Sequence, residues 1–195
     1  MHQLRKPSNR PSSDAVDVAA AAAAEAVHQA FMHRFVEAQY AWTAMLLDHL
    51  AQCRRRLGDL DAVVVLGVLG LSALAAARRE LERVPPGAVP DFYSDKVPPG
   101  SAINAHSLAE ITGIPRETVR RKLAFLARAG LIQRMPNRAW SLAATETGGA
   151  RARGDLQDLT DSAAGNLARL FARLVTLAEA AATEAKATRR AASGE

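Results

Sequence analysis

One stretch of the chain, residues 104–132 (NAHSLAEITGIPRETVRRKLAFLARAGLI), constrains the fold more than any other. Asn104 is a favourable N-cap, and the residues after it predict a short helix over 105–112. Gly113 then supplies a turn. Pro115 stands where a second helix begins, because its fixed φ and missing N–H suit a first helical turn. The stretch therefore predicts two short helices joined by a tight glycine turn.

The second of these helices has two chemically different faces. Val119, Leu123 and Leu126 recur at steps of four and three, which predicts that they form the buried face. The opposite face then presents Arg116, Glu117, Arg120 and Arg121 at the start of the helix, with Thr118 at its edge. Two arginines four apart on an exposed helix start can reach guanine edges in the major groove, because the guanidinium fork matches guanine O6 and N7.

The residues on either side of the second helix complete a small module. In the first helix we expect Leu108 and Ile111 to face inward, with Ile114 filling the space between the two helices. Residues 101–103 predict a short strand before the first helix.

A hairpin is predicted after the second helix. Gly130 is well placed to end that helix in a left-handed conformation. Residues 131–135 and 139–142 are separated by Pro136-Asn137-Arg138, which predicts two strands joined by a tight turn. Arg138 then lies at the tip, where it could enter a minor groove or contact a phosphate.

Positive charge is concentrated in this module. The chain has 25 basic and 20 acidic residues, a net charge of +5. Residues 100–140 contain seven arginines and lysines and two glutamates, a balance of 7 − 2 = +5, so the other 18 basic and 18 acidic residues cancel. Such confinement of positive charge is typical of a phosphate-binding surface.

This segment resembles the DNA-binding modules of bacterial winged-helix transcription regulators, in particular those of the MarR and GntR families. The most specific part is GIPRETVRRKLAFLARAGLI, residues 113–132. The resemblance implies that Arg116 and Arg120 match DNA-contacting positions of GntR-type modules, and that Thr118 matches a phosphate-contacting one. Glu117 departs from the usual serine or threonine. It could read a cytosine amino group or pair with Arg121, its i+4 neighbour, and we favour the pairing.

The resemblance implies double-stranded DNA as the partner of the module. The expected DNA-binding residues are Arg116, Glu117, Thr118, Arg120, Arg121, Lys122 and Arg138. Arg116 and Arg120 would read bases, whereas Lys122 and Arg138 would contact phosphates. The alternative function is a winged-helix adaptor, in chromosome segregation or complex assembly, whose basic face meets an acidic protein.

Long helices are predicted on both sides of the module. After a basic arm over 1–13, no proline or glycine occurs until Gly58, and Asp155 can cap a last long helix. The first helix has an apolar stripe at Val27, Phe31, Phe35, Ala38, Trp42, Met45, His49, Cys53 and Leu57. The last helix repeats Leu156, Leu159, Ala163, Leu167, Leu170, Leu174, Leu177 and Ala181, close to a coiled-coil seam. We expect helices of a second subunit to cover these stripes, which predicts a homodimer. The alternative for the first helix is two shorter helices with a bend near the alanine run.

The apolar run from Ala62 to Ala77 predicts a helix over 59–84, opened by Asp59 or Asp61. Its length approaches the roughly 20 residues that cross a bilayer. We favour a buried core helix, because the run is rich in alanine and glycine and has no aromatic belt. The chain is accordingly expected to be cytoplasmic, without a membrane partner.

The fold class expected is mostly α with a small β-hairpin wing. The expected organisation is an arm over 1–13, a helical dimerisation and core region over 14–84, a proline-rich connector over 85–100, a winged helix-turn-helix over 101–145 and a C-terminal dimerisation helix over 155–190. A small-molecule effector of unknown identity could bind between the dimer helices and the module, near Trp42, Phe92 or Tyr93.

Residues typical of catalysis or metal binding are sparse. The sequence shows no glycine-rich phosphate loop and no nucleophile elbow, and it has a single cysteine, Cys53. His49 lies four residues before Cys53, so the pair could share a metal or a redox role, with Arg54–Arg56 lowering the pKa of the thiol. His28, His33 and Glu37 could be ligands too, but none has the partners that a site requires. We expect no enzyme, no cofactor and no metal.

Overall fold

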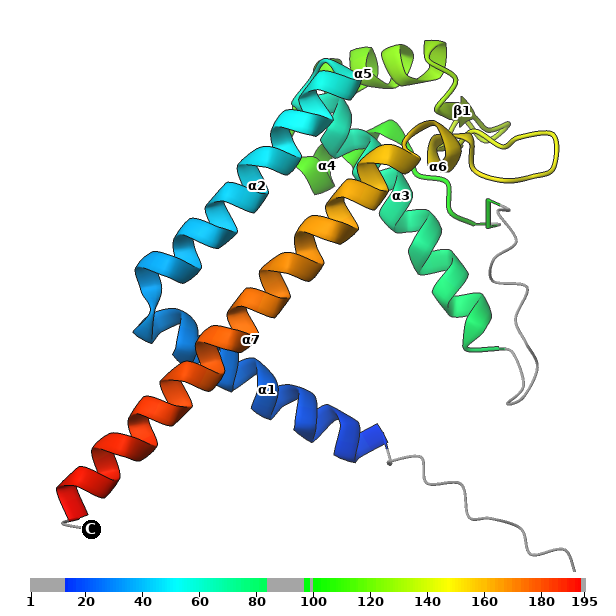
Figure 1. The fold of residues 1–195 in the computed structure, drawn as a ribbon. Helices are drawn as coiled ribbons and strands as arrows, with labels where there is room; N and C mark the ends of the chain where they lie inside the picture. The colour runs from blue at the N-terminus through cyan, green and yellow to red at the C-terminus, as the bar shows by residue number, and fades with distance from the viewer. Residues whose placement is uncertain (1–12, 84–96, 99, 194–195) are drawn as a thin grey trace, which may run out of the picture. The chain divides into compact units, whose positions relative to one another are not determined.

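The computed structural model describes residues 13–83, 97–98 and 100–193, and it divides the chain into two compact units. We call residues 47–164 the central unit, and residues 1–46 together with 165–195 the terminal unit. Both are mostly helical, and the described residues contain one two-stranded sheet (Figure 1). The basic arm and most of the connector, including Phe92 and Tyr93, lie outside the described residues.

The central unit contains the end of one long helix, four complete helices, a hairpin and the start of another long helix. In chain order these are α2 (Phe35–Leu57), α3 (Leu60–Leu81), α4 (Ala105–Thr112), α5 (Arg116–Arg128), β1 (Ile132–Arg134), β2 (Trp140–Leu142), α6 (Arg151–Asp155) and α7 (Gln157–Ser193). α3 packs against α4, α5 and β2, so it supports the module that these three elements form together with β1.

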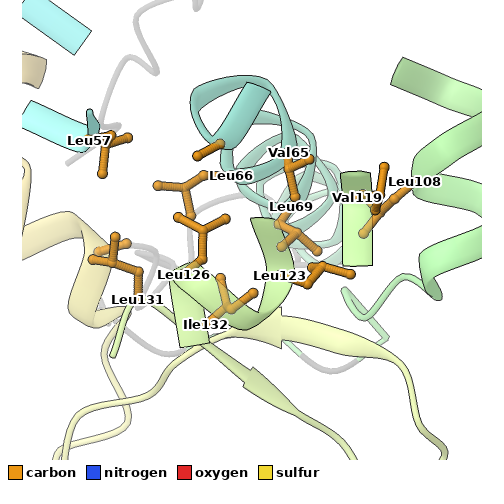
Figure 2. Close-up of a cluster of buried hydrophobic side chains, with 12 residues drawn as sticks. Leu57, Val65, Leu66, Leu69, Leu108, Val119, Leu123, Leu126, Leu131 and Ile132 are labelled. Carbon is orange, nitrogen blue, oxygen red and sulfur yellow. The ribbon is translucent and has the colours of Figure 1, made fainter. Parts of the chain in front are cut away.

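The core of the central unit lies between α3 and α5. Val119, Leu123 and Leu126 of α5 are buried, which confirms the predicted buried face. Val65 and Leu69 of α3 meet them in the close-up, with Leu108 of α4 and Ile132 of β1 at the edges (Figure 2). Burial of these side chains fixes the rotation of α5 about its own axis. The opposite face of α5 is therefore exposed to solvent.

The boundaries of α4 and α5 follow the predicted signals. Asn104 caps α4, and its side chain accepts a hydrogen bond from the Ser107 N–H at 2.9 Å. Gly113 ends α4 with a φ of 69°, and Gly130 follows α5 with a φ of 74°. Both are left-handed conformations that glycine adopts without steric cost. Pro115 is the residue directly before α5.

Ile111 of α4 differs from the prediction, because its side chain is 61% exposed. The residues of α4 that pack against the core are Ala105, Leu108 and Ala109. These three residues lie on one side of the helix. At about 3.6 residues per turn, Ile111 points away from the middle of that side. Ile114, in contrast, does pack against the core as expected.

The predicted hairpin is confirmed and is short. β1 and β2 are antiparallel, with Ile132 opposite Leu142 and Arg134 opposite Trp140. The Met135 N–H donates to the Ala139 carbonyl at 2.8 Å, which closes the turn. The strand predicted over 101–103 is reduced to a single bridge between Ile103 and Trp140.

The terminal unit is built from α1 (Ser13–His33), the first part of α2 and the larger part of α7. A single helix from the arm to Gly58 was expected, but the chain bends between α1 and α2 at Arg34 (Figure 1). The alternative of two shorter helices is therefore correct, although the bend lies beyond the alanine run. The Arg34 guanidinium also pairs with Glu37 at 3.7 Å and with Glu184 of α7.

Few described side chains of the terminal unit are buried. Ala30, Ala38 and Leu170 have low exposure, whereas large apolar side chains of all three helices remain in solvent. The exposed set includes Val18, Met32, Phe35, Val36, Tyr40, Trp42, Leu167, Phe171 and Val175. The described part of the terminal unit thus leaves large apolar side chains of all three helices in solvent.

The start of the last helix differs from the prediction. Asp155 was expected to cap it, but the chain is already helical from Arg151, and Asp155 is the last residue of α6. The chain turns at Leu156, with φ −118° and ψ 20°, before α7 begins. Arg56 of α2 donates to the Asp155 carbonyl at 2.6 Å, so this backbone oxygen has a partner outside its helix.

The apolar run of α3 forms a helix with a buried and an exposed side. Asp59 caps it, as one of the two predicted options, and accepts from the Ala62 N–H at 2.9 Å. Among the described residues, Leu60–Glu80 is the one helical stretch that is long and apolar enough to cross a membrane. Val65 and Leu69 nevertheless lie in the core of the central unit.

Candidate nucleic-acid interface

The first turns of α5 carry a group of exposed charged side chains. Arg116, Glu117, Arg120 and Arg121 are all exposed, and Thr118 is half-buried at their edge. This arrangement follows from the buried face on the other side of the helix, and it matches the predicted division of α5. The group thus points into solvent from a helix that is held rigidly by the core.

Arg116 contacts the preceding helix. Its guanidinium lies against Nδ1 of His106, and Nε2 of the same ring lies 3.3 Å from a carboxylate oxygen of Glu110. A guanidinium only donates hydrogen bonds, so Nδ1 acts as the acceptor in this contact. Sequence reasoning missed His106, because the contact joins two helices whose relative geometry no local pattern encodes.

Glu117 has a different partner from the one expected. Its carboxylate pairs with Arg120 at 3.0 Å, whereas Arg121 donates to the hydroxyl of Thr118 at 3.2 Å. Both contacts join residues three positions apart, a spacing that brings side chains together on a helix as well as four does. The predicted Glu117–Arg121 pairing is therefore wrong. Arg121 keeps its charge without a carboxylate partner among the described contacts.

Lys122 lies apart from the exposed group. Its Nζ is 2.6 Å from Oδ2 of Asp59, the N-cap of α3, and its side chain is only 21% exposed. The hydrogen bond from Lys122, followed by the one from the Ala62 N–H, holds the pKa of Asp59 below its ordinary value. Lys122 thus joins α5 to α3 and is not placed with Arg116 and Arg120.

The hairpin contributes two further arginines. Arg138 is exposed at the tip and has a φ of 64°, the one positive φ of a non-glycine residue in the described part of the chain. The Arg134 guanidinium lies 5.9 Å from the centroid of the Trp140 ring, a cation–π contact across the two strands. β1 packs against α5, so the hairpin and α5 belong to one structural block.

The His49 and Cys53 pair shows no sign of an activated thiol. The Cys53 sulfur lies 3.5 Å from Nε2 of His49, but Cys53 is buried and its burial raises the pKa of the thiol. The possibility that Arg54–Arg56 lower this pKa is not supported, because desolvation by burial is the largest influence on the thiol and raises its pKa. Among the described residues no group of three or more His, Cys, Asp or Glu side chains could hold a metal ion.

An apolar groove of about 400 Å³ is present elsewhere in the central unit. It is bounded by Leu66, Gly70 and Ala73 of α3, by Leu142 of β2 and by Leu156. Trp42, one of the residues proposed for an effector, is not among those that line it, and Phe92 and Tyr93 lie outside the described residues.

Comparison of the chain with protein-family models, with curated proteins and with solved structures gives no match. The functional argument therefore depends on the residues and the geometry described above.

Proposed function

We propose that this chain is a sequence-specific DNA-binding transcriptional regulator that reads DNA through a winged helix formed by α4, α5 and the β1–β2 hairpin. The observation that carries the proposal is the exposure of Arg116, Arg120 and Arg121 on the leading turns of α5, while the opposite face is fixed in the core. A helix presented in this way fits the major groove of B-DNA.

Arg116 and Arg120 are the proposed base readers. They lie four residues apart, so they project from the same part of α5 and can address neighbouring base pairs. Each guanidinium can donate two hydrogen bonds to guanine O6 and N7. On binding, Arg120 exchanges its contact with Glu117 for one with DNA, and Arg116 exchanges or keeps the contact with His106.

The remaining cations have supporting roles. Arg121 and Arg138 contact phosphates, because both are exposed and neither has a carboxylate partner among the described contacts. Lys122 is not proposed to contact phosphate, because its ammonium group pairs with Asp59. We propose instead that this ion pair joins α5 to α3. Lys122 then supports reading indirectly by holding α5 in place.

The proposal includes a homodimer on a roughly palindromic site. The exposed apolar side chains of the terminal unit support it, because patches of this kind on soluble proteins mark association surfaces. A two-fold dimer would place two copies of α5 on half-sites about one helical turn, ~34–36 Å, apart.

The test begins with unbiased selection of genomic DNA fragments by the purified chain. Arg116→Ala and Arg120→Ala should each lose about 1–3 kcal/mol of binding free energy on the selected fragment. Arg55→Ala is the matched control, because Arg55 is an exposed arginine of α2 in the same unit and lies outside the proposed surfaces, and it should bind like the wild type. Failure to select any sequence, or unchanged binding by both α5 variants, would contradict the proposal and favour the adaptor function.

A further inference from the structure

The outward side of α3 carries a regular row of apolar residues. We call this row the outer stripe, and it consists of Leu60, Val64, Gly67, Leu71 and Leu74. All five are exposed, with Leu71 at 66% and Leu74 at 64%. The steps of four, three, four and three residues keep them on one side of the helix, which is the spacing of a coiled-coil seam.

The opposite side of α3 is already committed to the core. Ala62, Val65 and Leu69 are buried there, and Val65 and Leu69 lie beside Val119 and Leu123 of α5 (Figure 2). α3 is therefore apolar on two opposite sides, of which the described residues cover one. A helix of this composition is normally covered on both sides. Insertion of α3 into a membrane would require the loss of its contacts with α5 and hence of the core.

Gly67 at the middle of the outer stripe supports an external partner. It lies inside a helix without a positive φ, and a Cβ built on it meets no described atom within 4 Å. Glycine destabilises a helix interior relative to alanine. Neither backbone conformation nor close packing among the described residues accounts for that cost. A close approach by another helix would account for it.

We propose that the outer stripe is a self-association surface on which α3 of a second copy packs antiparallel. The stripe complements itself in this direction. A two-fold axis near its middle sets Leu71 over Gly67 of the second copy, and sets Val64 against Leu74 of the second copy. Each contact occurs twice, and each large side chain of the central pair faces the glycine.

Charge favours the antiparallel direction. Asp61 is exposed near the start of α3, and Arg79 is exposed near its end, where Arg78 pairs with Glu82 at 3.4 Å. Antiparallel packing brings Asp61 of one helix toward Arg79 of the other and opposes the two helix dipoles, whereas parallel packing aligns the dipoles. One helix pair is smaller than a standard interface of ~1,600 Å², so the association should depend on concentration. This surface does not include the α5 arginines, and the inference does not rest on the proposed function.

The first test is the mass of the full chain in solution, measured by sedimentation equilibrium over about a hundredfold range of concentration. At a concentration where the outer stripe is associated, Leu71→Glu should lower the mean mass and leave only the association that the terminal unit supports. Ile111→Glu is the control, because Ile111 is an equally exposed apolar residue of the same unit on α4, and it should leave the mass unchanged. Equal masses for wild type and Leu71→Glu, with both folded by circular dichroism, would overturn the proposal in favour of a cover from the chain itself or a lipid.

The second test measures the direction of packing by disulfide formation. In a Cys53→Ser background, Val64→Cys and Leu74→Cys are made in separate chains with different tags and oxidised by glutathione disulfide. The mixture should form the mixed disulfide dimer at least tenfold more than either variant forms a dimer with itself. Linkage within each single variant would indicate parallel packing, and no linkage in any sample would indicate no contact. Either result would overturn the proposal. DNA binding is measured separately, so failure here leaves the proposed function intact.

Discussion

The central and terminal units of this chain contain similar helices but differ in what these helices bury. In the central unit, leucines and valines of α3, α4 and α5 interdigitate with almost no exposure, including Val65, Leu69 and Leu123. In the terminal unit the described buried side chains are Ala30, Ala38 and Leu170. The difference indicates that the central unit is stabilised by its own core, and it supports the proposed association through the terminal unit.

The physical cause lies in the residues that face inward. Burial of a leucine or valine side chain contributes about 1.5–3 kcal/mol, whereas alanine has little apolar surface to bury. Phe35 and Phe171 could contribute more, but their side chains lie in solvent in the single chain. We therefore expect perturbations of the buried core of the central unit to act on folding and perturbations of the exposed apolar side chains of the terminal unit to act on association.

The largest effect on the free energy of unfolding is expected when a buried leucine is replaced by alanine, a change that can be made in either unit. Leu123→Ala should lower the free energy of unfolding by about 2–5 kcal/mol, because it leaves a cavity in a packed core. Leu170→Ala should cost about 1 kcal/mol or less in the monomer, because Leu170 is the one large side chain among the buried residues described in its unit, outside the core cluster of the central unit. Urea denaturation at several protein concentrations would compare the two. An equal cost at all concentrations would refute the difference between the units.

A second prediction concerns association through the terminal unit. Phe171→Glu should weaken dimerisation roughly tenfold or more, because it replaces an apolar side chain that we expect to be buried by a second copy. Unfolding of the central unit, followed by Trp140 fluorescence in a Trp42→Phe background, should change little. Dimerisation as strong as that of the wild type would show that the terminal unit is not an association surface.

The smallest effect is expected at the ion pair that joins α3 to α5. Asp59→Asn keeps an N-cap acceptor but removes the charge facing Lys122, so it should cost about 0.2–1 kcal/mol. The pKa of Asp59 is lowered in the folded chain, so its contribution is complete above the ordinary aspartate value of about 3.9 and is lost as pH falls through the lowered pKa. Thermal unfolding of wild type and variant should converge in that acid range. A constant difference at all pH values would contradict this.

The parts of the module that depend on neighbouring residues could be predicted from the sequence. The cap at Asn104, the turns at Gly113 and Gly130 and the buried face of α5 each follow from preferences within one or two helical turns. The same local logic correctly separates the exposed Arg116 and Arg120 from the core.

Features that depend on distant parts of the chain could not be predicted. Lys122 reads as one more cation of a basic helix, but its partner Asp59 lies 63 positions away. Arg116 meets His106 only because the Gly113 turn sets the angle between α4 and α5. The pKa of Cys53 depends on burial, which outweighs the nearby arginines that the sequence shows. The bend at Arg34 has no proline or glycine to mark it.

The central claim is that α5 reads bases and does not only attract the DNA backbone. Its most direct test compares wild type and Arg116→Ala on every single-base variant of the selected DNA site. If Arg116 reads a guanine, the variant should lose discrimination at one base pair in each half-site, where the wild type discriminates by about 1–3 kcal/mol. Discrimination at all other positions should remain. A uniform loss of affinity on all sites, with the preference for bases unchanged, would contradict the claim.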